Sequence, residues 1–234
     1  MADTSHLPPE DQALYTGETH FFNYSHPDLA SFIEEHIPEE GASEQEIIEA
    51  LYTAVRDHWR YNAYLIHLDE EEWRAGSMMQ KKDAHCLDKA AILVSCLRGA
   101  GIPARLRLAK VKNHIAVDKL VEFLGNDVLV PHGYVEAWMG GKWLELTPAF
   151  NKELCQFLKV PVMEFDPVNG TKFQAYNLEN DQFMEYLEEY GHYDELPIDF
   201  ILKVFYETYP NVRPFVDQYK GQSKTLNVLE LVKS

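Results

Sequence analysis

The sequence has few cysteines and few basic residues for its length. Only three cysteines occur in 234 residues, so a disulfide framework is not expected, and the odd number leaves at least one thiol free. Lys and Arg number 21 against 38 Asp and Glu, which gives a formal net charge of −17. A charge of this sign repels phosphate backbones and anionic lipid. We therefore expect neither nucleic acid nor a membrane surface as a partner.

Long apolar runs and targeting signals are also missing. No apolar stretch reaches membrane-spanning length, and the first nine residues lack the basic start and apolar stretch of a signal peptide. A cytoplasmic location is therefore expected. Hydrophobic residues at 46% and charged residues at 25% are ordinary values for a globular protein, and no internal repeat or low-complexity tract occurs. These features predict one compact domain over residues 1–234.

Two helices are predicted in the first half of the chain. Prolines interrupt residues 1–42, so we expect an irregular lead-in with one short helix near 28–36. Ser43-Glu44-Gln45-Glu46 is a capping box, and the apolar residues behind it recur at helical spacing as far as about Tyr61. A second helix begins at Cys86 and stops at the Gly-Ala-Gly-Ile-Pro sequence that follows it.

Strand patterns follow these helices. Residues 104–111 alternate polar and apolar side chains, and residues 132–139 and 142–147 form a hairpin around Gly140-Gly141. Because the strands follow the helices rather than alternating with them, the sequence predicts an α+β fold. In this fold the helix that begins at Cys86 packs on an antiparallel sheet.

The remaining segments read as additions to this core. We expect the core to cover about 43–151, with a short helix near 116–124 inserted between its strands. Residues 152–234 are predicted to be a mostly helical C-terminal extension, with helices near 179–190 and 197–209.

Cys86 is the candidate nucleophile among the three cysteines. A reactive thiol needs a lowered pKa, and a helix N-terminus or a neighbouring imidazolium is a usual cause. Cys86 stands at a helix beginning, whereas Cys96 lies in the middle of the same helix among apolar residues, and Cys155 follows Leu154 beyond the hairpin. Cys96 and Cys155 are therefore interpreted as small buried residues.

The hairpin register selects His132 as the candidate base. If Gly140-Gly141 is the turn, Tyr134 faces Thr147, and His132 shares a sheet face with both. Diagonal neighbours of this kind lie about 7–8 Å apart between Cα atoms, which suits a side-chain hydrogen bond to an imidazole. The same register places Glu136 opposite Glu145, an unfavourable pair unless Arg105 or Arg107 binds one of them.

Several motifs in one order resemble the transglutaminase-like superfamily, over about residues 47–151. They are Cys86-Leu-Asp-Lys-Ala-Ala-Ile-Leu, Arg98-Gly-Ala-Gly-Ile-Pro-Ala-Arg105, His132-Gly-Tyr-Val-Glu-Ala-Trp and Trp143-Leu-Glu-Leu-Thr-Pro. The chain also resembles a bacterial subgroup of these proteins without well-defined substrates. The resemblance implies a papain-type fold, with Cys86 as nucleophile and His132 as general base.

The third catalytic position departs from the family pattern. The resemblance places the family's Asp on Thr147, whose hydroxyl can orient an imidazole but cannot offset its charge. Asn151, Glu145 and Tyr134 are candidates for a supporting role. For the oxyanion, the Cys86 backbone N–H is one predicted donor, and Gln80 occupies the place where papain-like enzymes have a glutamine, although an ordinary loop residue is the more common interpretation.

These residues predict cysteine-dependent acyl transfer on a peptide, protein or small amide, through a thioester. Hydrolysis is favoured over crosslinking because no sequence feature marks an amine site. No cofactor is expected, and no metal, because adjacent His85-Cys86 has poor ligand spacing and His114 has no cluster around it. The alternative is a non-catalytic binding module that retains the fold, motivated by Thr147.

Overall fold

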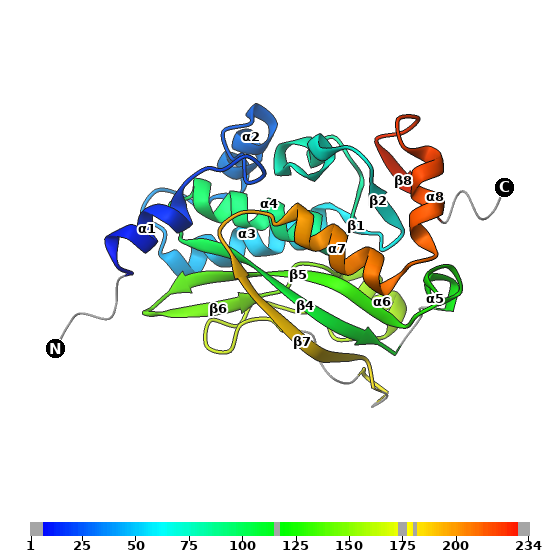
Figure 1. The fold of residues 1–234 in the computed structure, drawn as a ribbon. Helices are drawn as coiled ribbons and strands as arrows, with labels where there is room; N and C mark the ends of the chain where they lie inside the picture. Colours follow the sequence, from blue (N-terminus) through cyan, green and yellow to red (C-terminus); the bar gives the residue numbers. More distant parts are fainter. Residues whose placement is uncertain (1–6, 115–117, 173–176, 180–181, 229–234) are drawn as a thin grey trace.

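A computed structural model describes residues 7–114, 118–172, 177–179 and 182–228 of the chain. Its centre is a four-stranded antiparallel sheet with the order β6-β5-β4-β7 (Figure 1). The strands are β4 (Ala104–Asn113), β5 (Val128–Met139), β6 (Lys142–Leu146) and β7 (Met184–Tyr193). The predicted α+β architecture is confirmed.

Helices of the N-terminal half cover one face of this sheet. They are α1 (Pro9–Thr16), α2 (Pro27–His36), α3 (Glu44–His58) and α4 (Cys86–Gly99). The helix α4 packs directly on β4 and β5, and α3 packs against α4. Ser43 and Glu46 form the predicted capping box at the start of α3. The helices predicted near 28–36 and from residue 44 are confirmed, while α1 was not predicted.

The two faces of the sheet differ in chemistry. The face toward α4 is apolar and contributes to the main core through Leu106, Leu108, Val135, Ala137, Leu144 and Leu146. The opposite face carries charged pairs, of which Glu136 with Arg105 (2.6 Å) and with Arg107 (3.4 Å) are examples. These pairs confirm the predicted partners of Glu136, which faces Glu145 across the hairpin.

The hairpin register agrees with the sequence prediction. Trp138 pairs with Trp143 around Gly140 and Gly141, and both glycines have positive φ angles, 60° and 83°, which favour residues without a Cβ. The ladder ends one residue pair earlier than predicted, at Val135 and Leu146.

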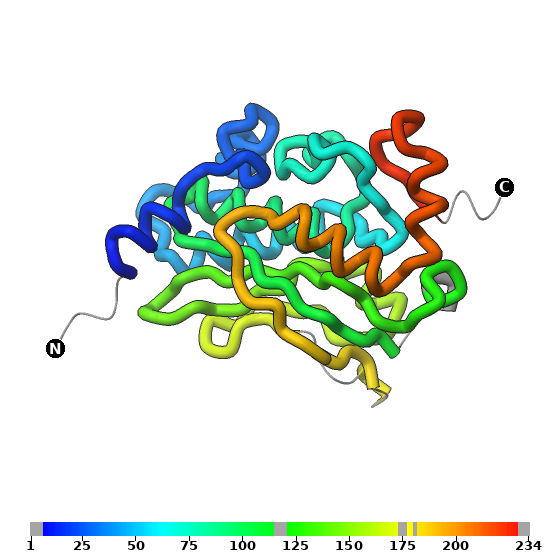
Figure 2. Tube along the Cα trace, viewed as in Figure 1, coloured from blue at the N-terminus to red at the C-terminus, as the bar shows by residue number. Residues whose placement is uncertain are grey.

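Among the described residues, two small sheets, two 3-10 helices and four further α-helices complete the fold. The strand β1 (Arg60–Tyr61) pairs with β3 (Asp83–Ala84), and β2 (Leu65–His67) pairs with β8 (Thr225–Asn227). The pairing of β2 with β8 brings the end of the described chain, in red, beside the cyan segment before α4 (Figure 2). The remaining elements are the short 3-10 helices η1 (Glu70–Trp73) and η2 (Ala75–Met78) and the α-helices α5 (Asp118–Leu124), α6 (Lys152–Leu158), α7 (Ile198–Thr208) and α8 (Val212–Tyr219).

The C-terminal part differs most from the sequence prediction. A helix was predicted near 179–190, but residues 184–190 belong to β7, which pairs with β4 and completes the sheet. The helix predicted near 197–209 is confirmed as α7, and α5 confirms most of the helix predicted near 116–124, whose first residues lie outside the described ranges. Neither α6 nor α8 was predicted. The chain after residue 151 thus contributes one strand, β7, to the central sheet.

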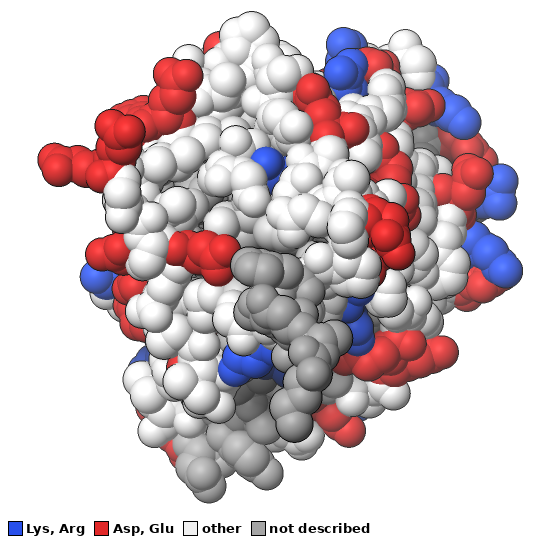
Figure 3. Space-filling model, turned by 90° about the vertical axis from the view of Figure 1, so that its left-hand side faces the viewer, with Lys and Arg blue, Asp and Glu red and all other residues white. Residues whose placement is uncertain are grey.

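The surface reflects the acidic composition. Acidic side chains lie along both sides of the face shown in Figure 3, in keeping with the net charge of −17. Among the described residues, no helix has both the length and the apolar character needed to cross a membrane.

Candidate functional site

Cys86 occupies the first turn of α4, as predicted. His85 precedes it as the N-cap, and its ring Nδ1 accepts a hydrogen bond from the Asp88 backbone N–H at 3.1 Å. The Asp88 carboxylate accepts from the His85 backbone N–H at 2.9 Å, which closes a capping box. This reciprocal cap fixes where the helix begins, and it leaves Cys86 half-buried at its start.

The strand β5 reaches the start of α4 through Gly133. A Cβ placed on Gly133 would lie 2.7 Å from Leu87 Cδ2 and 3.2 Å from Leu87 Cα, so the absence of a side chain allows the two segments to approach this closely. The Gly133 backbone N–H lowers the pKa of the Cys86 thiol, which places it near the sulfur. Because His132 is the residue before Gly133 in the same strand, the fold brings the backbones of the predicted nucleophile and the predicted base together.

Burial dominates the electrostatics of the Cys86 thiol. It raises the pKa of Cys86 to about 11. The Gly133 backbone N–H lowers this pKa, and the Asp88 charge raises it further. The helix N-terminus therefore does not by itself produce a thiolate in the free protein. This differs from the lowered pKa that the position of Cys86 at a helix start would favour.

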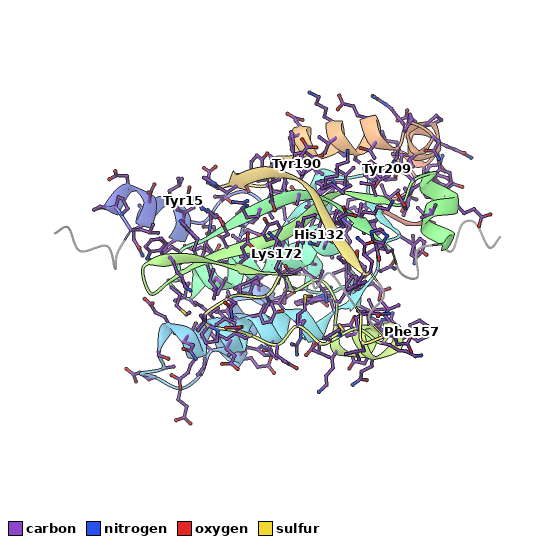
Figure 4. The ribbon with its side chains drawn as sticks, turned by 90° about the horizontal axis from the view of Figure 1, so that it is seen from below. Tyr15, His132, Phe157, Lys172, Tyr190 and Tyr209 are labelled. Atoms are coloured by element: carbon purple, nitrogen blue, oxygen red, sulfur yellow. The ribbon has the colours of Figure 1, made fainter. Side chains whose placement is uncertain are left out.

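His132 is almost completely buried, with 2% of its surface exposed. Burial lowers the pKa of His132 to about 3, and the nearby Glu189 carboxylate raises it only in part. The ring lies 6.1 Å from that of Tyr134, nearly parallel to it, and 6.3 Å from that of Tyr186. In the view of Figure 4, His132 lies over the central strands, with Lys172 on one side and Tyr209 on the other.

Thr147 does not orient His132 in this structure. Its side chain is fully buried, and its Oγ1 forms no hydrogen bond with any residue in the described part of the chain. Its backbone N–H donates to Thr171 Oγ1 at 3.0 Å, and its carbonyl oxygen accepts from Tyr52 at 3.2 Å. The predicted hydrogen bond from Thr147 to the imidazole is therefore absent, although the residue is well fixed by its backbone.

Of the four predicted supporting residues, the structure places Tyr134 beside His132. Its hydroxyl donates to Glu189 at 2.7 Å. The other three are engaged elsewhere: Gln80 is exposed and donates to Asp28, Glu145 pairs with Lys172 at 3.3 Å, and Asn151 accepts from the Tyr61 backbone and donates to Glu153. Gln80 therefore does not occupy an oxyanion position.

Two residues beside His132 were missed from the sequence, Tyr186 and Glu189. Both lie on β7. Glu189 accepts from the Tyr134 hydroxyl and pairs with Arg107 at 3.2 Å and with Lys172 at 3.4 Å, and its charge raises the pKa of His132. The signal that could have identified them is the pairing of this segment with β4, and its Glu-rich sequence favours a helix instead.

A buried polar cluster adjoins Cys86 on the other side of the N-cap. His67 Nε2 lies 2.8 Å from Asp88 Oδ1, and His67 Nδ1 lies 2.9 Å from Thr225 Oγ1. With His85 included, one ligand atom from each of His67, His85 and Asp88 lies within 4.8 Å of the others, a set that could hold a metal ion. No sequence motif indicates this set, because His67 reaches it through the fold. In this structure the Asp88 carboxylate hydrogen-bonds to His67 Nε2 and to the His85 backbone N–H, and His67 Nδ1 hydrogen-bonds to Thr225 Oγ1.

Cys86 lines an apolar pocket of about 100 Å³. One part of its wall comes from the segments next to Cys86, including Tyr61, Leu65 and Pro131. Another part comes from α7 and the residues after it. That part includes Ile201, Phe205, Tyr209 and Val228.

Comparison with known proteins supports the sequence resemblance. Residues 33–148 match the family model described as the Transglutaminase-like superfamily. No curated protein matches the chain. Three solved structures share parts of the fold. A candidate cysteine protease from Cytophaga hutchinsonii is 12% identical, with a TM-score of 0.45, over 80% of this chain and 55% of that chain. The periplasmic domain of TgpA from Pseudomonas aeruginosa is 20% identical, with a TM-score of 0.42, over 62% of this chain and 48% of that chain, and red sea bream transglutaminase is 15% identical, with a TM-score of 0.40, over 62% of this chain and 32% of that chain.

The chain covers between 32% and 55% of the lengths of these three structures. The family match, rather than these distant likenesses, carries the assignment. That match includes α4 with Cys86, the strand β5 with His132 and the hairpin that follows it. Through residues 33–148, the chain belongs to the transglutaminase-like superfamily.

Proposed function

We propose that this protein catalyses acyl transfer from an amide substrate, with Cys86 as the nucleophile and His132 as the general base, and that water is the usual acceptor. Membership of the superfamily supports cysteine-based catalysis in general, and both hydrolysis and crosslinking fit it. The observation that supports the assignment of residues is the close approach of β5 to the start of α4, where a Cβ on Gly133 would lie 3.2 Å from Leu87 Cα. His132 is the residue before Gly133 on this strand.

The proposed reaction has two halves. In the first, the Cys86 sulfur attacks the amide carbonyl carbon while its proton passes to His132, and the C–N bond then breaks as His132 returns that proton to the leaving amine. In the second, water attacks the thioester, His132 takes its proton, and the C–S bond breaks to release a carboxylic acid and the thiol. An amine in place of water would give a crosslink through the same steps.

The neutral state of both groups shapes this mechanism. Burial raises the pKa of Cys86 and lowers that of His132, so the free protein holds a thiol and a neutral imidazole rather than an ion pair. The proton therefore moves during the attack. The negative charge of Glu189 favours the imidazolium that forms at that point. Tyr134, whose ring lies 6.1 Å from that of His132, donates a hydrogen bond to this carboxylate.

A binding module that retains the fold is the second candidate. The raised pKa of Cys86 and the missing hydrogen bond from Thr147 Oγ1 both favour it. In such a module Cys86 would be an ordinary buried thiol, and His132 would have no effect on its reactivity. The two candidates therefore differ in whether His132 assists Cys86.

Alkylation of Cys86 by iodoacetamide tests this difference. The second-order rate constant would be measured by peptide mass mapping in the unmodified protein and in His132→Gln. We expect the substitution to slow alkylation of Cys86 by about 100-fold at pH 7, since a positioned base contributes about 10²–10⁴-fold to proton transfer. Tyr24→Phe, which alters a tyrosine hydroxyl remote from Cys86, is the control and should leave the rate unchanged.

The pH dependence sharpens the same experiment. Because the pKa of His132 is lowered to about 3, the imidazole stays neutral and able to accept a proton at pH 5. The ratio of the two rate constants should then be the same at pH 5 as at pH 7. If His132 had an ordinary pKa near 6.5, this ratio would be about 30-fold smaller at pH 5 than at pH 7. Equal rates in the two proteins at both pH values would favour the binding module.

The acceptor, the substrate and the location remain parts of the proposal. Peptides and small amides are the proposed substrates, and the cytoplasm the proposed location. Once a thioester has formed on Cys86, adding a primary amine separates the two outcomes: an amide product indicates crosslinking, and unchanged acid release indicates hydrolysis.

A further inference from the structure

The pocket beside Cys86 is built by two parts of the chain. Its inner wall comes from the segments around Cys86, which lie within the family-matched residues 33–148. Its outer wall comes from α7 and the segment after it, through Ile201, Phe205 and Tyr209, and from Val228 after β8. The outer wall therefore lies outside the residues that match the family model.

The lining of this pocket is almost entirely apolar. It includes no Lys, Arg, Asp or Glu among the described residues. Its histidines and tyrosines are partly engaged: His67 hydrogen-bonds through both ring nitrogens, and the Tyr209 hydroxyl bonds to the backbone of Val130 and Val128. A charged group entering the pocket would lose its hydration without gaining an ion pair, which is strongly unfavourable.

The size of the pocket limits its occupant further. A cavity of about 150 Å³ lined by apolar side chains can hold benzene. The pocket here measures about 100 Å³, so it is too small for an aromatic ring without movement of its walls. A branched aliphatic group with three or four carbon atoms fits the space better.

We propose that the substrate presents a short, uncharged aliphatic group to this pocket, next to the carbonyl carbon that Cys86 attacks. Such a group has the size of a valine or leucine side chain. The limit is set by the outer wall, and Phe205 is its chief determinant, because its side chain is large and half-buried and its ring packs 5.0 Å from that of Tyr209. This inference rests on the proposed role of Cys86 as nucleophile.

Methanethiosulfonate reagents test the pocket without requiring turnover. In each, the Cys86 thiolate sulfur attacks the sulfur that bears the alkyl group, so a disulfide to that alkylthio group forms, the S–SO2 bond breaks and methanesulfinate leaves. The reagents would carry an isobutyl, a benzyl, a trimethylammonioethyl or a sulfonatoethyl group, and each rate constant would be divided by that for free cysteine to remove intrinsic reactivity. Peptide mapping would separate Cys86 from Cys96 and Cys155, which are buried.

We expect the isobutyl reagent to react at least ten times faster than the other three after this correction. Phe205→Ala should bring the benzyl reagent to the isobutyl rate, and Phe205→Leu should give part of that gain with less loss of packing. Phe200→Ala is the matched control, because Phe200 lies on the same helix but packs on Tyr190 and Tyr193. It should leave all four rates unchanged.

Two results would overturn the inference: charged reagents as fast as the isobutyl reagent, or a benzyl rate that Phe205→Ala and Phe205→Leu do not alter. Failure of the proposed function would look different. In that case the reagents would still be selected by size and charge, while His132→Gln would have no effect on alkylation of Cys86.

Discussion

The family-matched core and the C-terminal part of this chain contribute differently to the candidate site. Residues 33–148 supply the nucleophile, the base and the close approach of β5 to α4. The described residues after 148 supply Glu189 on β7 and the outer wall of the pocket on α7. The core thus holds the groups proposed to react. The C-terminal part raises the pKa of His132 in part and forms the pocket wall that we propose limits what reaches Cys86.

This difference has a consequence for variants. Changes in the core should alter how fast Cys86 reacts with any reagent or substrate. Changes in the C-terminal part should alter which reagent or substrate is preferred, with smaller effects on the rate itself. Variants in both parts test that division, and the one with the largest expected effect lies in the core.

Gly133→Ala should damage the reaction most. The added Cβ would meet Leu87 at 2.7 Å from Cδ2 and 3.2 Å from Cα, so we expect the Leu87 side chain to shift and β5 to move away from the start of α4. A displacement of about 1 Å can lower a reaction rate about 100-fold, and we expect a loss of about 10- to 100-fold in the alkylation rate of Cys86. Overpacking should also lower the free energy of unfolding by about 1–3 kcal/mol, measured by urea denaturation.

A second substitution provides the control for Gly133→Ala. Leu87→Ala removes the Cδ2 atom that the new Cβ would strike, but the backbone of residue 87 still lies close to that Cβ. The double variant should therefore recover part of the alkylation rate. An unchanged rate in Gly133→Ala alone would show that the approach of β5 to α4 is unimportant for Cys86.

Glu189→Gln should have a smaller effect that comes from the C-terminal part. Glu189 raises the pKa of His132 and so favours the imidazolium that forms during attack. Its side chain is 38% exposed, and a partly exposed charge contributes only about 0.2–1 kcal/mol, so we expect alkylation of Cys86 to slow by about 3-fold. The matched control is Glu185→Gln, because Glu185 lies on the same strand but pairs with His114. A loss above 100-fold would place Glu189 among the essential groups and weaken the division between core and C-terminal part.

Thr147→Val should leave the reaction unchanged. Because Thr147 Oγ1 has no hydrogen bond among the described residues, replacing the hydroxyl by a methyl group removes an unsatisfied buried group. We expect the free energy of unfolding to rise by about 1 kcal/mol, while the alkylation rate stays within about 2-fold. Thr171→Val is the contrasting variant: its Oγ1 accepts from the Thr147 N–H, so its loss should destabilise the protein by about 1–3 kcal/mol. A 10-fold slower reaction in Thr147→Val would restore Thr147 as the group that orients His132.

The core could be predicted from the sequence because its signals are local. A capping box, a Gly-rich helix stop and a Gly-Gly turn each depend on a few neighbouring residues, and the turn determines which side chains face one another in the hairpin. Glu136 illustrates this, since its predicted arginine partners are the observed ones.

The features that could not be predicted depend on contacts between distant segments. The segment of β7 contains glutamates that favour a helix, and only its pairing with β4 makes it a strand. The cluster around His67 and Asp88 needs β2 and α4 to meet. For Thr147, the register could not show the direction of Oγ1, which is a rotamer choice made by the surrounding packing.

The most direct test of the account is to trap the acyl group on Cys86. The protein would be mixed with p-nitrophenyl isobutyrate, an activated ester with a short aliphatic acyl group. We predict a burst of p-nitrophenolate equal in amount to the protein, and a hydroxylamine-sensitive isobutyryl mass on the peptide that contains Cys86. Cys96→Ala, in the middle of the same helix, should retain the burst, and Cys86→Ala should abolish it. A burst that persists in Cys86→Ala, or an acyl group found on another residue, would contradict the role of Cys86 as the nucleophile.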